Sequence, residues 1–337
     1  MRRRDVPTEF HASAPMRLDF AGGWTDVPPF SAREGGVVVN GAIEQRAHVD
    51  LRLGGTLLRF VSEELGETLE CANAGGLTPG GKLPLLKAAL RMLPVLGGFT
   101  LTTRCDAPPG SGLGSSGALG VALVGVLSRA RQETRAQPEC ADQAWQIETV
   151  EAQLPGGKQD QYAAALGGFH RLSFRDPDVG IEPLTLDRSF AAELERHILL
   201  CYTNKSRVSG DTISRVMHGF ERGDRAITAA LHGIRAAGEA MVEALRRADL
   251  AGVAALLSEN WKHQQALDPG MRTPDMARLE QAAAAAGALG GKAAGAGAGG
   301  SMFFIMKGEA KAAVPAALAA GARVLPVRWA AEGVRSW

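Results

Sequence analysis

A glycine-rich loop followed by two serines is the segment of this sequence best suited to chemistry. Residues 108–118 are Pro-Pro-Gly-Ser-Gly-Leu-Gly-Ser-Ser-Gly-Ala, and the small and apolar segment 117–130 predicts a helix directly after the loop. Glycine lets the backbone approach a ligand closely, and the free N–H groups at a helix start favour anions. The loop therefore predicts a phosphate site, with a plain glycine-rich turn as the alternative. Its spacing excludes a Walker A motif and a Rossmann dinucleotide fingerprint.

Two carboxylates on either side of a Pro-Gly-Gly turn form the second candidate site. Glu148 lies in a predicted helix, 141–154, and Asp160 lies near the start of another, 158–166. One carboxylate can accept a proton from a reacting hydroxyl while the other holds Mg²⁺. Lys158, two residues before Asp160, has an ammonium group able to contact a phosphate, and it is a further candidate catalytic residue. The alternatives are a solvated helix glutamate, a helix-start aspartate and a surface lysine.

The elements around these segments predict β-structure first and mostly helices later. Strands are expected at 14–20, 37–39, 47–53 and 100–106. Residues 175–189 contain two prolines, a glycine and several acids, and they predict the linker between two domains. The remaining elements are strands at 197–202, 302–306 and 323–327, and helices at about 209–222, 224–247, 249–265, 274–287 and 309–320.

Composition limits the class of protein. A chain of 337 residues exceeds the size at which one core usually stops growing, so two domains are expected. The formal net charge of +1 gives no footprint for nucleic acid or for an anionic membrane. The longest apolar stretch is too short to span a bilayer, and no apolar run follows the basic N-terminus. The four cysteines form no C-x-x-C pair, which favours free thiols in a cytoplasmic protein.

The glycine loop resembles the second signature of the GHMP kinases, the superfamily of galactokinase, homoserine kinase and mevalonate kinase. The resemblance holds residue for residue over 108–118 and implies that the loop wraps the phosphates of ATP and that the hydroxyl of Ser116 reaches Mg²⁺. The ATP-binding residues implied here are Pro109, Gly110, Ser111, Gly112, Leu113, Gly114, Ser115 and Ser116.

Two further segments resemble the first and third signatures of the same superfamily. Residues 14–26 are similar to the first, which shapes the sugar pocket; this implies a catalytic role for Arg17 and sugar contacts from Gly23, Thr25 and Asp26. A turn-capping role is the alternative for Asp26, whose carboxylate can accept two hydrogen bonds from vicinal hydroxyls. Residues 295–300 are similar to the third signature and imply that Gly297 contacts ATP. Ala298 stands where the family usually has glycine, and an alanine there is strained if its φ is positive.

The carboxylate segment resembles that of galactokinase-like members. They carry a metal-binding glutamate on one helix and a base aspartate in a following turn, which implies Glu148 for Mg²⁺ and Asp160 for the base. Glu151, one turn further along the helix, is the fallback metal ligand. The implied fold is α+β with two domains: an N-terminal domain at 1–180, of the ribosomal protein S5 domain 2-like type, and a C-terminal ferredoxin-like domain at 181–337.

The branch of the superfamily is indicated by residues 156–169, 202–207, 260–262 and 287–292, which resemble the bacterial D-glycero-D-manno-heptose 7-phosphate kinases. This resemblance implies an ATP-dependent kinase that phosphorylates the anomeric hydroxyl of a heptose 7-phosphate. Lys158 and Arg207 are then expected to bind the acceptor, with Lys205 and Lys262 as further cations or plain surface charge.

Other functions stay open at this point. The L-fucokinase-like branch shares residues 22–26 and would take an unphosphorylated sugar or cyclitol, and Asn204 stands where the heptose branch usually has glycine. A catalytically silent sugar sensor on the same fold is the alternative outside enzymes. The expected ligands are ATP, Mg²⁺ and a small sugar or sugar phosphate, and no oligomeric state follows from the sequence.

Overall fold

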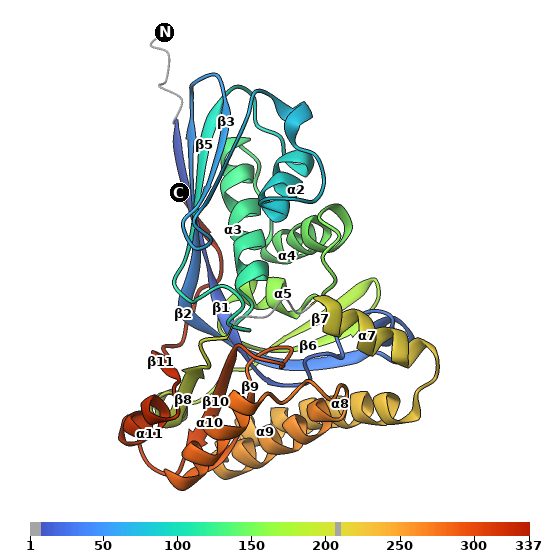
Figure 1. The fold of residues 1–337 in the computed structure, drawn as a ribbon, viewed down its shortest axis with the longest axis vertical. Coiled ribbons are helices and arrows are strands. Elements are labelled where there is room, and N and C mark those ends of the chain that lie inside the picture. Colours follow the sequence, from blue (N-terminus) through green and yellow to red (C-terminus); the bar gives the residue numbers. More distant parts are fainter. Residues whose placement is uncertain (1–7, 206–209) are drawn as a thin grey trace.

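Two β-sheets organise the chain in the computed structural model, which describes residues 8–205 and 210–337 (Figure 1). The larger sheet has the order β12-β1-β2-β5-β3-β4, and β6 pairs with residues 36–41 of β2 and with β7. Its strands are β1 (Glu9–Ala21), β2 (Gly36–Leu53), β3 (Leu58–Ser62), β4 (Glu67–Cys71), β5 (Phe99–Cys105), β6 (Phe169–Arg175), β7 (Asp178–Pro183) and β12 (Arg335–Ser336).

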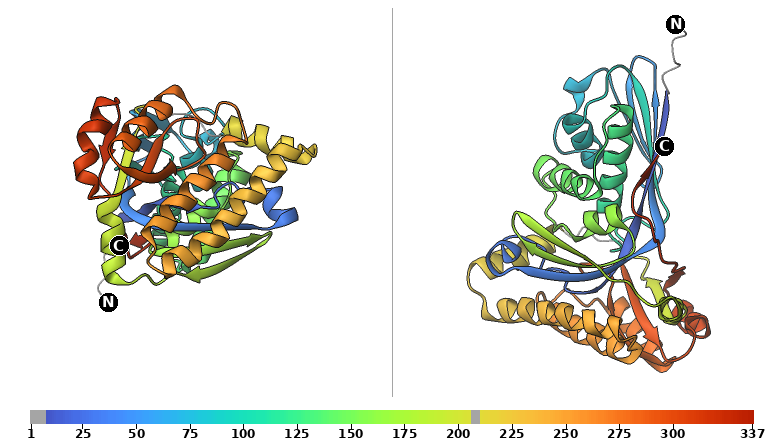
Figure 2. Two further views of the ribbon diagram at one scale, coloured as in Figure 1. Left: turned by 90° about the horizontal axis from the view of Figure 1, so that it is seen from below. Right: turned by 180° about the vertical axis from the view of Figure 1, so that it is seen from behind.

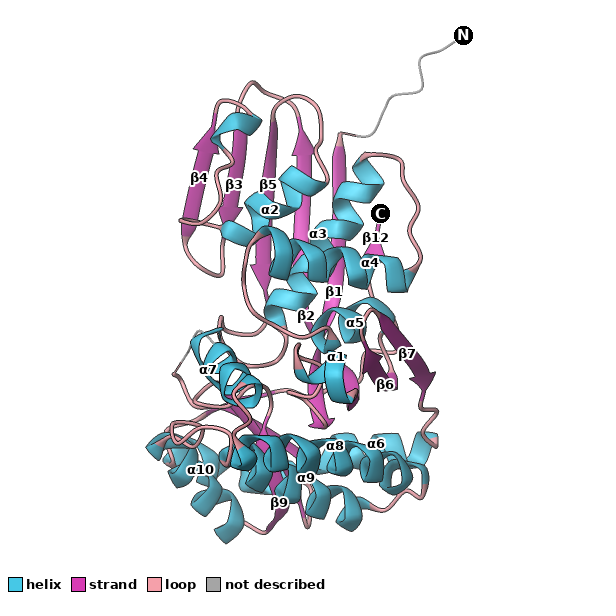
Figure 3. Ribbon diagram, turned by 90° about the vertical axis from the view of Figure 1, so that its right-hand side faces the viewer, coloured by secondary structure: helices cyan, strands magenta, loops and turns pink. Residues whose placement is uncertain are grey.

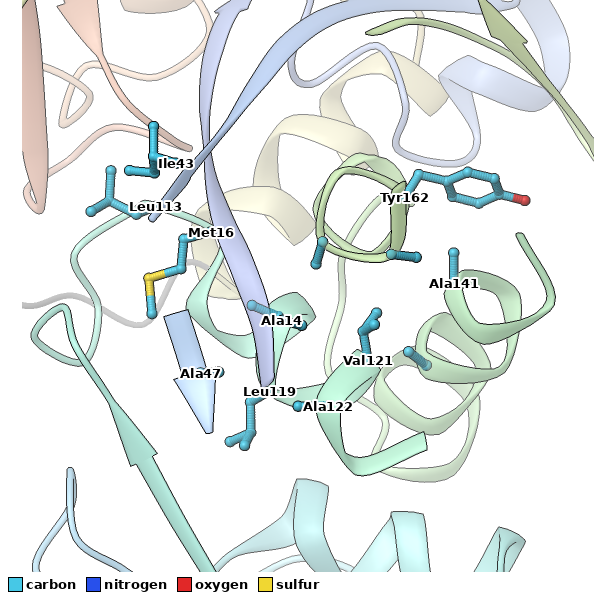
Figure 4. Packing of buried hydrophobic residues seen from close by; sticks show 14 of the residues in the cluster. Ala14, Met16, Ile43, Ala47, Leu113, Leu119, Val121, Ala122, Ala141 and Tyr162 are labelled. Atoms are coloured by element: carbon cyan, nitrogen blue, oxygen red, sulfur yellow. The ribbon is translucent and has the colours of Figure 1, made fainter. Parts of the chain in front are cut away.

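Helices cover one face of the upper part of this sheet, as Figures 1 and 2 show. They are α2 (Pro84–Met92), α3 (Ser115–Ala130), α4 (Gln137–Trp145) and α5 (Gln159–Leu166). Twelve of the sixteen residues of α3 are buried, because the helix carries small and apolar residues on all of its faces. Figure 4 shows Ala14 and Met16 of β1 beside the residues of α3, with α4 and α5 completing the core.

The smaller sheet has the antiparallel order β11-β8-β10-β9, with α8, α9 and α10 in the layer beneath it (Figure 3). Its strands are β8 (Ile198–Tyr202), β9 (Ala288–Ala293), β10 (Ser301–Met306) and β11 (Arg323–Leu325). The helices of this half are α6 (Arg188–His197), α7 (Gly210–Glu221), α8 (Arg225–Arg246), α9 (Leu250–Gln265), α10 (Pro274–Ala285) and α11 (Val314–Ala319). Side chains of Asp224, Asp249 and Thr273 cap the starts of α8, α9 and α10.

The two halves pack closely against each other. A Cβ atom at Gly238 of α8 would lie 2.8 Å from the carbonyl oxygen of Val37 in β2, so only glycine fits at this crossing. Trp24, Val27 and Phe30 of the first half belong to the core of the second. The expected α+β architecture with two sheets is confirmed.

Several element predictions are corrected by the structure. The strands expected at 37–39 and 47–53 are one continuous strand, β2, because the polar residues between them are held inside the sheet; Arg46, for example, donates to the Ser13 hydroxyl and to the carbonyl of Gly333. The glycine-rich stretch after 287 contains a strand, β9. The helix expected at 309–320 is divided into the 3₁₀-helix η3 (Ala310–Ala313) and α11.

The linker expected at 175–189 is wrong. Residues 178–183 form β7, which is paired with β6 along its whole length, and α6 begins at Arg188. The division at 180 and 181 therefore cuts a strand of the larger sheet, and β12 returns to that sheet at the end of the chain. The domain division itself stays a prediction.

None of the helices in the described part of the chain is long and apolar enough to cross a membrane. The four cysteines are free thiols; Cys140 and Cys201 are buried, and Cys71 and Cys105 are half-buried.

Candidate active site

A cavity of about 430 Å³ lies where the two halves of the chain meet. The glycine loop, the turn after β1 and the start of α5 supply its polar side. Leu65, Pro155 and Ile213 are among the residues that supply its apolar side. A concave space with a few converging polar groups is the usual form of a small-molecule site.

The glycine loop has the geometry of a phosphate site. Gly110, Gly112 and Gly114 have φ values of 68°, 75° and 77°, a region that residues with a Cβ rarely adopt. The helix α3 begins at Ser115, and no side chain caps it, so its first N–H groups are available to an anion. Six of the eight expected ATP-binding residues of the loop line the cavity; Ser111 and Leu113 are buried in the packing behind it.

Arg17 connects three parts of the site. Its guanidinium donates to Oδ1 of Asp160 at 2.8 Å and 2.7 Å, to the carbonyl of Gly112 at 2.7 Å and to the carbonyl of Ala294 at 3.0 Å. These partners belong to the start of α5, to the glycine loop and to the turn after β9. The side chain is only 5% exposed, so these charge-assisted bonds form in a water-poor environment.

Glu148 and Asp160 lie close enough to affect each other. The pKa of Glu148 is raised to about 7, mainly by burial and also by the nearby Asp160 carboxylate. The hydrogen bond from the Ser116 hydroxyl acts in the opposite direction and lowers the pKa. Gln161 also donates to Glu148. The two predicted carboxylates and the predicted metal-binding hydroxyl of Ser116 are thus brought together.

The element that carries Glu148 differs from the prediction. The helix expected at 141–154 ends at Trp145 and continues as a π-helical turn, η2 (Gln146–Glu151). The wider π-turn removes the three-residue repeat that would place Glu151 on the same face as Glu148. Glu151 instead forms an ion pair with Arg91 of α2, so it is not the fallback metal ligand.

Asp26 faces the cavity from the turn after β1. Its carboxylate accepts hydrogen bonds from the backbone N–H of Gln159 at 3.0 Å and from the side-chain amide of Gln159 at 3.3 Å. Burial raises the pKa of Asp26 to about 6, and the carboxylates of Asp160 and Asp19 contribute to this rise. Gly157 must be glycine here, because a Cβ would lie 1.9 Å from the Asp26 carboxylate.

Of the other first-signature residues, Gly23 lines the cavity and Thr25 does not. The Thr25 hydroxyl donates to the carbonyl of Gly22 at 2.7 Å and accepts from the N–H of Val37 at 3.1 Å. It is fully buried and holds the turn in shape. The expected sugar contact of Thr25 is therefore replaced by a structural one.

The sequence reasoning missed the ion pair between Asp19 and Lys292. The ammonium of Lys292, which is fully buried in β9, donates to Oδ2 and to the carbonyl of Asp19, both at 2.8 Å. Burial lowers the pKa of Lys292, and Asp19 counteracts this effect. Residues two apart on a strand share a face, so the predicted strand at 14–20 already placed Asp19 on the same face as Arg17. This spacing was the sequence signal that Asp19 lies near the site.

Three further expectations are changed by the structure or lie outside it. Lys158 does not face the cavity: its ammonium is 3.1 Å from Oδ1 of Asp176 and 3.1 Å from the carbonyl oxygen of Pro177. Gly297 packs against Met271, and Gly295 and Ala296 line the cavity in its place. Arg207 lies outside the described residues.

Ala298, the departure from the third signature, has a φ of 60°. It therefore adopts the left-handed conformation for which glycine is the preferred residue. The loop keeps its shape through a backbone hydrogen bond from Ala298 to Met271.

The charges on the cavity wall fit a divalent cation. Four carboxylates, those of Asp19, Asp26, Glu148 and Asp160, face it from the described part of the chain, and Arg17 is the one cationic side chain of that part that lines it. Mg²⁺ is usually held by one or two carboxylates together with substrate phosphates. Glu148 and the Ser116 hydroxyl, beside the glycine loop, offer that oxygen set.

Comparisons with known proteins agree with this geometry. The model of the GHMP kinases N terminal domain matches residues 84–168, and that of the GHMP kinases C terminal matches residues 241–322. The chain is 32% identical to the D-glycero-alpha-D-manno-heptose 7-phosphate kinase of Campylobacter jejuni, over 96% of this chain and 97% of that protein. It is 27% identical to the L-fucokinase/L-fucose-1-P guanylyltransferase of Bacteroides fragilis, over 87% of this chain but 34% of that longer protein.

Solved structures show the same fold. A D-glycero-D-manno-heptose 1-phosphate kinase from Bacteroides thetaiotaomicron superposes with a TM-score of 0.79 at 26% identity and covers 97% of this chain and 98% of its own. The galactokinase of Lactococcus lactis superposes with a TM-score of 0.77 at 19% identity and covers 98% of this chain and 96% of its own. The two-domain fold expected from the signatures is thus confirmed.

Replacing Arg17 with lysine tests whether the guanidinium holds the site together. Arg17→Lys keeps the charge but cannot reach all three partners, so two or more charge-assisted bonds are lost, at about 1.5–3 kcal/mol each. We expect kcat to fall at least tenfold and the melting temperature to decrease by several degrees. Arg59→Lys, in an exposed pair with Glu70, is the matched control and should change neither. Wild-type-like turnover in Arg17→Lys would contradict this role.

Replacing Glu148 with glutamine tests the charge balance of the site. The native protein binds a proton on Glu148 more tightly than the unfolded chain does, so stability is lost as the pH rises from about 4.5 to about 7. Without metal at pH 8, we expect Glu148→Gln to melt about 2–4 °C above wild type, and the difference to disappear near pH 5. Added MgCl₂ should raise the melting temperature of wild type more than that of the variant. Equal responses to Mg²⁺ would remove Glu148 from the metal site.

Proposed function

The chain belongs to the GHMP kinase family, and from this premise we propose that it transfers the γ-phosphoryl group of ATP to the anomeric hydroxyl of D-glycero-D-manno-heptose 7-phosphate, giving the 1,7-bisphosphate. The observation that carries the proposal is the convergence of the glycine loop, Arg17, Asp160 and Glu148 on one cavity, in a chain that is similar over nearly its full length to a heptose 7-phosphate kinase.

The chemistry follows from the positions of the groups. ATP places its phosphates on the glycine loop at the start of α3, and the acceptor lies between Asp26 and Asp160. The acceptor oxygen forms a bond to the γ-phosphorus while the bond to the β-phosphate oxygen breaks, which releases ADP. Asp160 accepts the hydroxyl proton, and Arg17 holds the Asp160 carboxylate in position.

Mg²⁺ is part of this proposal. Ser116 and Glu148 would hold it beside the phosphates, where it would supply positive charge to the transferring group. The excess of carboxylates over cations on the described cavity wall supports this assignment. The silent-sensor alternative is not favoured, since the loop, the base and the metal-binding carboxylate are all present and assembled.

The proposed contact with the acceptor's own phosphate involves Arg207. Lys158 is engaged elsewhere, and Lys205 and Lys262 are 70% and 75% exposed and pair with Asp275 and Glu259. Arg207 therefore carries the proposed phosphate contact alone, on the strength of the sequence. The acidic wall favours an unphosphorylated acceptor as the second candidate, of the kind that the similar L-fucokinase is named for.

Replacing the proposed base gives the first test. Asp160→Asn keeps the shape but removes the proton acceptor, so kcat should fall by roughly 10²–10⁴ while ATP still binds. Turnover by steady-state kinetics and ATP binding by calorimetry measure the two effects. Asp142→Asn, which removes a carboxylate partner of Tyr162 on the far side of α5, is the control and should keep most of the activity. A change of only a few-fold in Asp160→Asn would show that Asp160 is not the base.

A panel of acceptors gives the second test. Heptose 7-phosphate, free heptose, L-fucose, mannose and galactose are compared by kcat/KM at fixed ATP. We expect the 7-phosphate to be preferred, and Arg207→Met to raise its KM about tenfold or more, since a charge-assisted contact contributes roughly 1.5–3 kcal/mol. The KM for ATP should change much less. A clear preference for a free sugar would overturn the heptose 7-phosphate assignment and leave the kinase assignment intact.

A further inference from the structure

Lys158 occupies a closed environment behind the cavity. The residue is 4% exposed, and its ammonium forms an ion pair with Oδ1 of Asp176 and donates to the carbonyl of Pro177. It also lies over the ring of Trp145, 4.7 Å from the ring centre. The second oxygen of Asp176 accepts a hydrogen bond from the Ser31 hydroxyl at 3.1 Å, so the acidic partner is itself fixed.

These contacts join the two elements that carry the catalytic carboxylates. Trp145 is the last residue of α4, and η2 with Glu148 follows at once. Lys158 directly precedes α5, whose second residue is Asp160. Lys158 binds the turn between β6 and β7, which holds Asp176 and Pro177, and the end of α4 is joined to this turn through the contact of Trp145 with Lys158.

We propose that Lys158 is a positioning residue, which sets the placement of Glu148 relative to Asp160 by holding the end of α4 and the start of α5 against the β6–β7 turn. The group of Lys158, Trp145 and Asp176 is here called the lysine clamp. This inference deepens the proposed function, because it assigns a structural cause to the spacing of the two carboxylates in that same site.

The lysine clamp has a physical reason to be rigid. A buried ammonium that loses its partner is costly, so the ion pair, the carbonyl and the aromatic ring hold it in one place. One turn further along, the hydroxyl of Tyr162, the fourth residue of α5, donates to Asp142 of α4 at 2.8 Å. Together, these two contacts fix the first turn of α5 against the second half of α4.

Positioning and substrate contact predict different kinetics. A lysine that binds the acceptor's phosphate raises the acceptor KM when it is removed. Removal of a lysine that positions two carboxylates lowers kcat instead, because displacement of catalytic groups by about 1 Å can cost up to 10²-fold in rate. Removal of such a lysine also changes the Mg²⁺ concentration needed for half-maximal rate, since Glu148 is the proposed metal-binding carboxylate.

The experiment compares Lys158→Met, Lys158→Arg, Asp176→Asn and the Lys158→Met/Asp176→Asn double variant with wild type. We expect Lys158→Met to lower kcat about tenfold or more, with the acceptor KM within about twofold and a raised Mg²⁺ requirement. Lys158→Arg should restore part of the rate. Asp176→Asn should show the same pattern, and the double variant should be no slower than the slower single variant, because both changes remove one interaction.

Lys87→Met is the matched control. Lys87 is as buried as Lys158 and donates to the carbonyl of Gly80 in the first half of the chain, but it does not line the cavity. The Lys87→Met variant should have a lower melting temperature than wild type, with unchanged kcat and an unchanged Mg²⁺ requirement. Equal loss of kcat in Lys87→Met, unchanged kcat in a folded Lys158→Met, or a tenfold rise in acceptor KM alone would each overturn the proposal.

A readout without turnover separates this inference from the acceptor assignment. With a non-hydrolysable ATP analogue, added MgCl₂ should raise the melting temperature of wild type and Lys87→Met by the same amount, and that of Lys158→Met by less. If heptose 7-phosphate is not turned over while this difference is found, the acceptor is wrong and the lysine clamp stands. Equal shifts in all three proteins would overturn the lysine clamp whatever the acceptor is.

Discussion

The guanidinium of Arg17 is the interaction on which the site depends. It reaches from β1 to the start of α5, to the glycine loop and to the turn after β9, which are distant in sequence and belong to both halves of the chain. A planar group with donors in fixed directions can satisfy an acid and two carbonyls together, which a lysine cannot. The long strands β1 and β2 cross from one half to the other and thus place this residue at the junction.

Close backbone approach is the second constraint, and it explains the glycines around the cavity. The loop of 110–114 turns through three residues with positive φ, and a Cβ at Gly117 would lie 2.6 Å from that of Asp160. Helix α3 can therefore start directly beside the base. The same argument applies between the halves, where a Cβ at Gly295 would lie 2.5 Å from the carbonyl oxygen of Gly112. Larger residues at these positions would move the phosphate site away from the carboxylates.

Short sequence motifs predicted several of the residues that line the cavity. The glycine loop, Glu148, Asp160 and Asp26 belong to short motifs and do line the cavity, although their partners there are distant in sequence. Thr25, Glu151 and Lys158 could not be placed correctly, because the direction of each side chain is set by distant partners: Val37, Arg91 and Asp176. The same limit explains the missed β7, because the prolines, glycine and acids of residues 175–189 resemble a linker until pairing with β6 satisfies the backbone of β7.

The described cavity wall carries more carboxylates than cationic side chains. Burial raises the pKa of both Glu148 and Asp26, so the protein loses stability when it keeps these groups ionised near neutral pH. Arg17 and the buried Lys292 already have carboxylate partners in Asp160 and Asp19. A cation bound beside Glu148 would offset the repulsion from Asp160 and favour the ionised form of Glu148. Binding of a metal–nucleotide complex would therefore offset the cost of the buried carboxylates, and this gain in stability would add to the affinity for that complex.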